Sequence, residues 1–230
     1  MSTALKETTA SAKVTDLLRE EIISGKLSEG QRVTIQEIAS MFSVSQTPVR
    51  EAFRALEGER LLEVVPYKGA IVRKIDEEFF FQVISVCEAL EVSANEQVMK
   101  SMTDEQLEQL CSINDQILAL QNTPEDIVRH RELNRAFHSQ IMQWAGNSIA
   151  ISLHQYYHDI ALMVRSKYYH SYERIQAVGR EHQLIIDAFR DKDAFALKYA
   201  TDFHSRNAKL DFHIRYQQSM SEADKEQQGR

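Results

Sequence analysis

Proline is almost absent from the part of the chain that follows Tyr67: from there to Arg230 it occurs only at Pro124. Because a proline inside a helix removes a backbone hydrogen bond and clashes with the preceding turn, its absence leaves long helices uninterrupted. Glycine, the other common helix breaker, numbers only seven in 230 residues, well below its usual share of about 7%. This part of the chain is therefore predicted to be mostly long α-helix.

The distributions of charged residues and of histidines divide the chain into two parts. Residues 1–75 hold 11 Lys and Arg against 10 Asp and Glu, whereas residues 76–230 hold 16 against 24 and all eight histidines. Two units with different chemistry fit this division. We predict a first domain over residues 10–75, a helical domain over residues 76–217 and a frayed polar tail over residues 218–230.

The first domain begins with the pattern of a helix-turn-helix. After a helix over Ala12–Ser24, a capping box at Thr34–Glu37 starts a short second helix, which breaks before Ser45. A third helix then starts with Ser45 or Thr47 as its cap and Pro48 in its first turn, where the missing N–H does no harm. Two helices joined by so tight a turn can place the second one in a DNA major groove.

Two β-prone runs follow, Leu62–Pro66 and Ala70–Arg73, on either side of a turn that contains Gly69. Runs of this kind around a glycine turn predict a β-hairpin. A hairpin directly after a helix-turn-helix is a wing, so residues 10–75 are predicted to form a winged helix-turn-helix.

The third helix of this domain directs polar side chains outward from its first turns. Arginine reads guanine, glutamine suits adenine, and hydroxyl groups contact phosphates or bases. A solvated helix face would carry similar residues, and the chain's net charge of −7 differs from the basic composition of many DNA-binding proteins. We therefore expect dimerisation to supply affinity. The predicted DNA contacts are Gln46, Thr47, Arg50 and Arg54, with Lys68 and Gly69 at the tip of the wing.

These residues carry a family resemblance. Val44–Ala52 reads Val-Ser-Gln-Thr-Pro-Val-Arg-Glu-Ala and, with Ile23–Leu27 and Lys68–Val72, is similar to the winged helix of GntR-type bacterial repressors. The resemblance implies a homodimer that binds a palindromic double-stranded DNA operator. Gln46 stands where the family usually has arginine, and Glu29 where it usually has proline. Operator sequence or affinity is therefore expected to differ from that of relatives.

The second domain is predicted to be an antiparallel bundle of six helices. Its starts and ends are marked by caps, such as Thr103 and Thr123 at helix starts and Gly146 at a helix end. The predicted helices cover Glu77–Ser101, Thr103 to Leu120, Thr123 to Trp144, Asn147 to about Lys167, Ser171–Arg190 and Asp193–Gln217.

Several imidazoles of the bundle occupy positions suited to a metal site. Asn134 and His138 lie four residues apart, so both side chains leave one face of a helix. His182 and His204 lie in the middle of two other helices, among apolar residues. Imidazole nitrogen and amide oxygen bind first-row metals, and bundles build metal sites between their helices. Hydrogen-bonded packing residues would fit the same spacing.

A second resemblance favours the metal site. The stretches Asn134–His138, Gly146–Asn147, Glu181–His182 and Ile186–Ala188, together with His204, are similar to the all-helical FCD ligand-binding domain of the fatty-acid-regulator branch of GntR proteins. In that family aspartate is common at the first ligand position, where this chain has asparagine. The resemblance implies a divalent ion, with zinc, nickel and manganese all open, held by Asn134, His138, His182 and His204.

An ion with neutral ligands attracts anions, so we expect a small carboxylate effector that displaces water from the metal. The predicted effector contacts are Arg135, Arg165 and Tyr156, for which surface or packing roles fit equally well. Cys87 stands where the family often has arginine, so one effector contact is absent or supplied elsewhere.

The sequence thus predicts a mostly helical, homodimeric transcriptional repressor that is not an enzyme. It contains no apolar run of about 18 residues and no charged-then-apolar leader, so a membrane span and a secretory signal are not expected. Two cysteines, Cys87 and Cys111, are too few for a disulfide framework. We therefore expect a cytoplasmic protein.

Two alternatives stay open. His158 and Asp159 are adjacent, as in metal-dependent phosphohydrolases that use a His-Asp pair, and His154 with His158 has the same four-residue spacing as the proposed ligands. Such an enzyme also needs a general base and an open metal position. The other alternative is a DNA-binding protein that has no effector.

Overall fold

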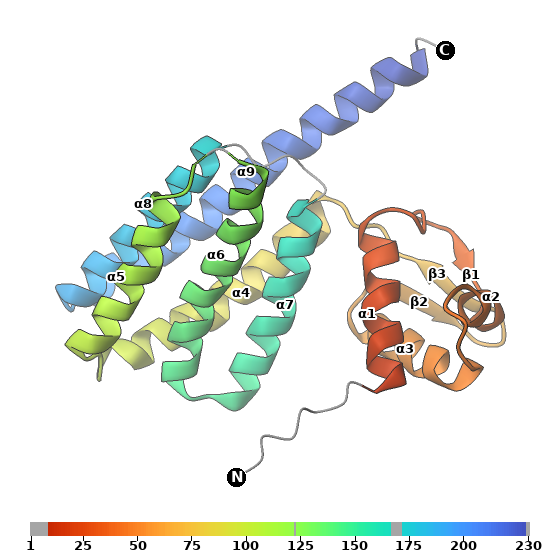
Figure 1. Cartoon of the computed structure of the whole chain (residues 1–230), viewed down its shortest axis with the longest axis horizontal. Helices are drawn as coiled ribbons and strands as arrows, with labels where there is room; N and C mark the ends of the chain where they lie inside the picture. The colour runs from red at the N-terminus through yellow and green to blue at the C-terminus, as the bar shows by residue number, and fades with distance from the viewer. Residues whose placement is uncertain (1–8, 122, 167–171, 229–230) are drawn as a thin grey trace. The chain divides into compact units, whose positions relative to one another are not determined.

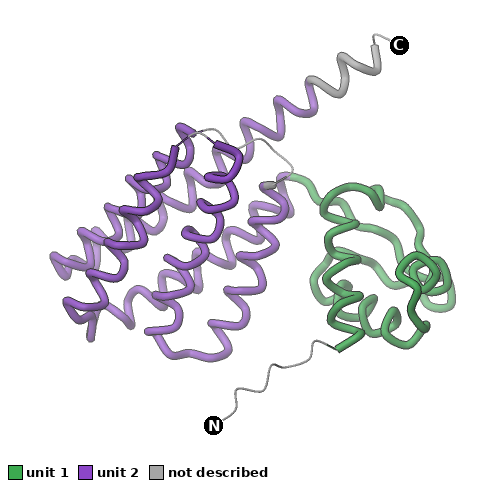
Figure 2. The backbone as a smooth tube through the Cα atoms, in the orientation of Figure 1, with its two compact units in different colours: residues 1–76 green, residues 77–230 purple. Residues whose placement is uncertain are grey.

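The computed structural model of the chain describes residues 9–121, 123–166 and 172–228. The chain separates into two compact units, residues 1–76 and residues 77–230 (Figure 2). The predicted fold class is confirmed, because helices dominate and a small three-stranded sheet lies in the first unit (Figure 1). None of the described helices combines the length and apolar character needed to cross a membrane.

From residue 9 onward, the first unit combines three helices with a three-stranded antiparallel sheet. Its elements are α1 (Ala10–Ile23), β1 (Arg32–Val33), α2 (Ile35–Met41), α3 (Gln46–Gly58), β2 (Leu62–Val65) and β3 (Gly69–Val72). The strand order is β1-β3-β2, so β3 lies in the centre. Leu18 of α1, Ile38 of α2 and Leu56 of α3 are completely buried and form part of the core. This core fixes α3 by its apolar face and leaves its other face exposed.

The helix-turn-helix forms at the predicted residues. The Thr34 hydroxyl accepts a hydrogen bond from the Glu37 amide (3.2 Å), and the Glu37 carboxylate accepts one from the Thr34 amide (2.7 Å), so the capping box is confirmed. Ser43 adopts φ of +54° in the turn between α2 and α3. Helix α3 begins directly after Ser45, which identifies Ser45 rather than Thr47 as the N-cap residue.

The strand β1 was not predicted from the sequence. Two residues give no alternating pattern, and the strand exists only because Arg32 and Val33 pair with β3. At the start of β3, Gly69 has φ of +92°, and a Cβ atom there would lie 2.1 Å from the carbonyl oxygen of Val33. Only glycine permits this close approach. A backbone requirement therefore accounts for Gly69 without the DNA contact that the sequence suggested.

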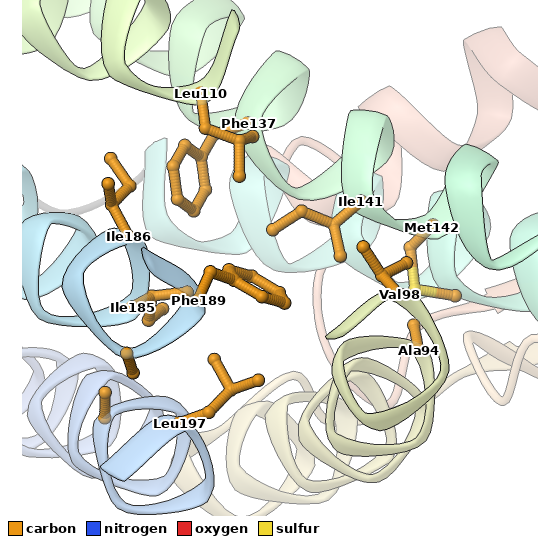
Figure 3. Close-up of a cluster of buried hydrophobic side chains, with 12 residues drawn as sticks. Ala94, Val98, Leu110, Phe137, Ile141, Met142, Ile185, Ile186, Phe189 and Leu197 are labelled. Atoms are coloured by element: carbon orange, nitrogen blue, oxygen red, sulfur yellow. The ribbon is translucent and has the colours of Figure 1, made fainter. Parts of the chain in front are cut away.

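Six helices make up the described residues of the second unit. They are α4 (Glu77–Met99), α5 (Asp104–Leu118), α6 (Pro124–Ala145), α7 (Ser148–Ser166), α8 (Tyr172–Arg190) and α9 (Ala194–Gln228). Helix α4 packs against α6, α7 and α9, and α8 packs against α5 and α9. One apolar cluster joins several of them, with Val98, Phe137, Phe189 and Leu197 directed toward a shared interior (Figure 3).

The predicted end of the last helix at Gln217 was wrong, whereas the frayed polar tail over residues 218–230 stays a prediction. Helix α9 does not end near Gln217 but continues to Gln228, and it projects past the other helices of the bundle (Figure 1). Residues 218–228 contain neither glycine nor proline, and seven of these eleven residues are Gln, Glu, Lys or Ala. These are strong helix formers, so nothing in the segment stops the helix.

We predict that Gly69→Ala destabilises the first unit far more than Gly30→Ala. Both glycines have positive φ (+92° and +73°), but an added Cβ at Gly30 meets nothing within 4 Å. The control substitution should therefore cost only backbone strain, about 1 kcal/mol, whereas Gly69→Ala adds overlap with a backbone oxygen and should cost roughly 3 kcal/mol or more. Urea denaturation of the full chain measures both, and equal losses would contradict the close approach.

Candidate nucleic-acid interface and metal centre

The start of α3 presents an uncovered polar face. Val49, Ala52 and Phe53 bury the opposite face in the core of the first unit. The Arg50 guanidinium lies 3.4 Å from the side-chain oxygen of Gln46, so these two side chains share one surface. Four of the predicted DNA contacts are exposed on this helix, namely Gln46, Thr47, Arg50 and Arg54.

The turn of the wing carries a second exposed group. Lys68 is exposed there, as a phosphate contact requires. Its neighbour Tyr67 is also fully exposed and has φ of +61°, an uncommon conformation for an aromatic residue. Sequence reasoning missed Tyr67, although a bulky aromatic side chain in a hairpin turn was a visible signal.

In the bundle, three of the predicted metal ligands converge. One ligand nitrogen from each of His138, His182 and His204 lies within 4.8 Å of the others, and all three residues are buried. They come from α6, α8 and α9, so the packing of three helices brings together residues that are far apart in the sequence. The spacing of these nitrogens is compatible with a shared ion.

Two buried carboxylates orient these imidazoles. Glu91 Oε1 lies 3.1 Å from His138 Nδ1 and 2.7 Å from His154 Nε2, and Glu181 Oε2 lies 2.7 Å from His204 Nδ1. When Nδ1–H donates to a carboxylate, Nε2 keeps its lone pair for a metal. Sequence reasoning missed both glutamates as partners of the ligands, because only the packed structure brings α4 and α8 carboxylates beside these rings.

The two carboxylates stay ionised. Burial opposes the charge of Glu181, but hydrogen bonds from His204 and Arg174 prevail and lower its pKa to about 2. Burial likewise opposes the charge of Glu91, and His138 and His154 nevertheless hold its pKa well below the usual range. The site therefore has two negative charges, and each carboxylate is hydrogen-bonded to one of the predicted ligand histidines. These charges would partly offset the positive charge of a bound ion.

His182 provides the test of whether these residues fit a metal. Neither of its ring nitrogens has a hydrogen-bond partner among the described residues. Its ring stacks on that of Phe137, with the two ring centroids 3.9 Å apart. Burial lowers its pKa well below the usual value, and His204 and His138 lower it further, so the ring is neutral. A buried polar atom without a partner is costly. A metal ion bound by one ring nitrogen would give that atom a partner, so the residues fit.

The fourth predicted ligand lies beside a residue that the resemblance did not select. The side-chain nitrogen of Asn134 is 3.3 Å from Nε2 of His158, and both residues are buried. Burial, followed by His138 and His154, lowers the pKa of His158 well below its usual value, so this ring is neutral as well. Only the four-residue spacing of His154 and His158 signalled this in the sequence.

A small cavity of about 30 Å³ adjoins these groups. Arg165 is a buried member of its lining, and its Nη2 atom has no hydrogen-bond partner, with the nearest Asp211 oxygen 3.8 Å away. Burial and then Arg174 lower the pKa of Arg165 to about 10, so it stays charged at neutral pH. The lining includes Cys87, Glu91, Asn134, His138, His158, Arg165, His204 and Ser205.

The other two predicted effector contacts do not line this cavity. The Arg135 side chain is half exposed and pairs with Asp159 at 2.7 Å. Tyr156 packs edge to face against Tyr157, with ring centroids 5.0 Å apart. The adjacent His158 and Asp159 of the alternative enzyme thus separate, since Asp159 engages Arg135 and His158 faces Asn134.

Two known families match the chain. Residues 10–72 match the family described as bacterial regulatory proteins, gntR family, and residues 82–207 match the FCD domain. The HTH-type transcriptional regulator YdhC of Bacillus subtilis (strain 168) is 27% identical over 184 residues, covering 79% of this chain and 81% of its own. The gluconate operon transcriptional repressor of the same organism is 26% identical over 196 residues, covering 82% and 79%.

A solved structure agrees with the fold. Escherichia coli McbR/YncC matches with a TM-score of 0.63 at 19% identity, over 92% of this chain and 99% of that one. The fold of this chain is therefore similar to the fold of that protein.

We predict that His182→Leu abolishes the stabilisation that divalent ions give. Leucine has similar volume and no unpaired polar atoms, so the metal-free variant should melt at or above the temperature of the metal-free wild type. Added zinc or nickel should raise the melting temperature of the wild type but not of the variant. His213→Leu, at a half-exposed histidine that pairs with Glu77, is the matched control. Full metal-dependent stabilisation of His182→Leu would count against the ligand set.

Proposed function

Because the chain belongs to the GntR family, with a GntR winged domain at residues 10–72 and an FCD domain at residues 82–207, we propose that it is a homodimeric transcriptional repressor controlled by a small carboxylate. The effector binds beside a divalent metal in the bundle and weakens binding to a palindromic operator. The protein acts in the cytoplasm, with the DNA. The observation that carries this proposal is that three buried histidines converge in the second unit of a chain whose first unit exposes the polar face of α3.

Two exposed groups support the DNA-binding part of the proposal. The N-terminal turns of α3 offer Arg50 for a guanine and Gln46 for an adenine, and Thr47 for a phosphate or base edge. Lys68 on the wing adds one phosphate contact. The first unit is nearly neutral, so a single copy would bind non-specific DNA weakly. Two copies on adjacent half-sites supply the affinity.

The cavity supports control by a carboxylate. Asn134 with three neutral imidazoles holds a divalent ion, and the ion supplies an attachment point for an anionic oxygen. Arg165 lies in the same lining with Nη2 lacking a hydrogen-bond partner, as a second carboxylate oxygen requires. About 30 Å³ holds only one or two water molecules. An organic acid therefore has to displace neighbouring side chains or helices, which gives it unequal affinity for two arrangements of the bundle.

The chain is a regulator and not an enzyme, since its family and relatives are transcriptional regulators. The structure also disfavours the phosphohydrolase alternative, because His158 contacts Asn134 whereas Asp159 pairs with Arg135. A DNA-binding protein without an effector stays as the competing function, and the Arg165 experiment below separates it from the proposal.

We predict that Arg50→Ala removes specific operator binding, because a bidentate arginine–guanine contact contributes roughly 1–3 kcal/mol of discrimination. Footprinting on a selected operator, with circular dichroism to verify the fold, measures this. Arg129→Ala is the charge-matched control, since Arg129 is exposed in the second unit and pairs with Glu132. An unchanged footprint for Arg50→Ala would contradict the assignment of this face to DNA.

We predict that Arg165→Met raises the concentration of carboxylate needed for half-maximal operator release by about 10-fold or more, because a hydrogen bond to a charged group contributes roughly 1.5–3 kcal/mol. Fluorescence anisotropy of a labelled operator, with a panel of small carboxylates that includes gluconate, measures the release. Arg129→Met should behave as the wild type. If no carboxylate releases the wild type, the protein has no effector of this class, and the competing function is favoured.

A further inference from the structure

We infer that His158 is a positioning residue for the metal centre: it accepts a hydrogen bond from the Asn134 amide and thereby turns the amide oxygen toward the ion. The inference deepens the proposed function and rests on its metal site. Nothing in the family resemblance gives His158 a role.

The contact between the two side chains is short and buried. Asn134 lies on α6 and His158 on α7, and the Asn134 side-chain nitrogen is 3.3 Å from His158 Nε2. An amide NH₂ group only donates, so Nε2 accepts and the ring proton resides on Nδ1. Both residues line the cavity that His138 and His204 also line. The side-chain nitrogen of Asn134 therefore bonds to His158 on α7, while Asn134 itself lies beside the predicted ligand histidines.

An asparagine ligand needs this support for a chemical reason. A carboxylate has two equivalent oxygens and presents one to a metal in either orientation. An amide has one oxygen that can coordinate a metal and one nitrogen that cannot. Of its two orientations, which differ by a 180° flip, only one therefore presents the oxygen to the ion. A hydrogen-bond acceptor placed beside the nitrogen selects the productive one. His158 is that acceptor in this chain.

Direct coordination by His158 is the competing role. The nitrogens of His138, His182 and His204 lie within 4.8 Å of one another, and His158 is outside that group. Its ring centroid is 5.4 Å from that of His138, and its Nε2 atom faces the Asn134 nitrogen. The geometry thus favours a residue that acts through Asn134 over a fifth ligand.

A double-mutant cycle tests the inference with zinc and nickel as probes. Isothermal titration of the full chain compares the wild type, His158→Leu, Asn134→Asp and the double variant. His158→Leu should weaken metal binding by roughly 10- to 100-fold when residue 134 is asparagine, in the range found for residues that orient ligands. With aspartate at 134 the same substitution should cost less than about threefold, because a carboxylate needs no orientation; that difference is the coupling the cycle isolates.

Three controls make the cycle decisive. His158→Gln keeps an acceptor and should retain most of the affinity, and His213→Leu, which removes a histidine far from these contacts in sequence and paired with Glu77, should leave it unchanged. Circular dichroism and melting of the metal-free proteins verify folding. If His158→Leu does not fold, His158→Phe, which keeps a ring and lacks an acceptor, replaces it in the cycle.

Each outcome of these experiments either supports or overturns the positioning role of His158. An equal loss with asparagine and aspartate at 134 overturns the positioning role, as does no loss with asparagine. The visible spectrum of the cobalt(II) protein counts imidazole ligands, and the loss of one in His158→Leu would make His158 a ligand and also overturn the inference. If the wild type binds neither ion, the proposed metal centre fails together with the inference. If the wild type binds and the cycle shows no coupling, only the inference fails.

Discussion

Burying three imidazoles within 4.8 Å of one another is the constraint on which the second unit depends. Burial lowers the pKa of His182 and His204, which avoids the cost of buried charge, but buried nitrogens still require partners. Glu91 and Glu181 provide partners for His138 and His204 from outside the cluster, whereas His182 has none among the described residues. In the proposed function, a divalent ion held by the three histidines gives a ring nitrogen of His182 its partner.

The same arrangement explains how a small molecule would act on the whole bundle. The proposed ligands come from α6, α8 and α9, and the cavity beside them is also lined from α4 and α7. A carboxylate that entered about 30 Å³ would press on helices that otherwise pack against one another. Packed interiors respond to such pressure by moving between discrete arrangements rather than by compressing. An ion alone would stabilise the bundle without that movement.

Much of the fold could be predicted because its signals are local. Thr34 and Glu37 cap α2, Asp193 caps α9, and the scarcity of proline leaves the bundle helices long. The misses were non-local: β1 exists only through its pairing with β3, and Gly69 is required by a distant carbonyl oxygen. Spacing could not tell ligand histidines from packing ones, so the metal set came from resemblance. The residues that support it, including Glu91 and His158, became visible only when helices far apart in sequence were packed together.

The central claim is that the bundle controls the DNA-binding face of α3 through a metal-dependent carboxylate site. The most direct test is the affinity of the wild-type protein for its operator, measured by anisotropy with and without carboxylate, before and after removal of the metal by a chelator. We expect carboxylate to weaken operator binding in the metal-loaded protein and to have no effect after chelation. The same carboxylate response without metal, or an operator affinity independent of both, would contradict it.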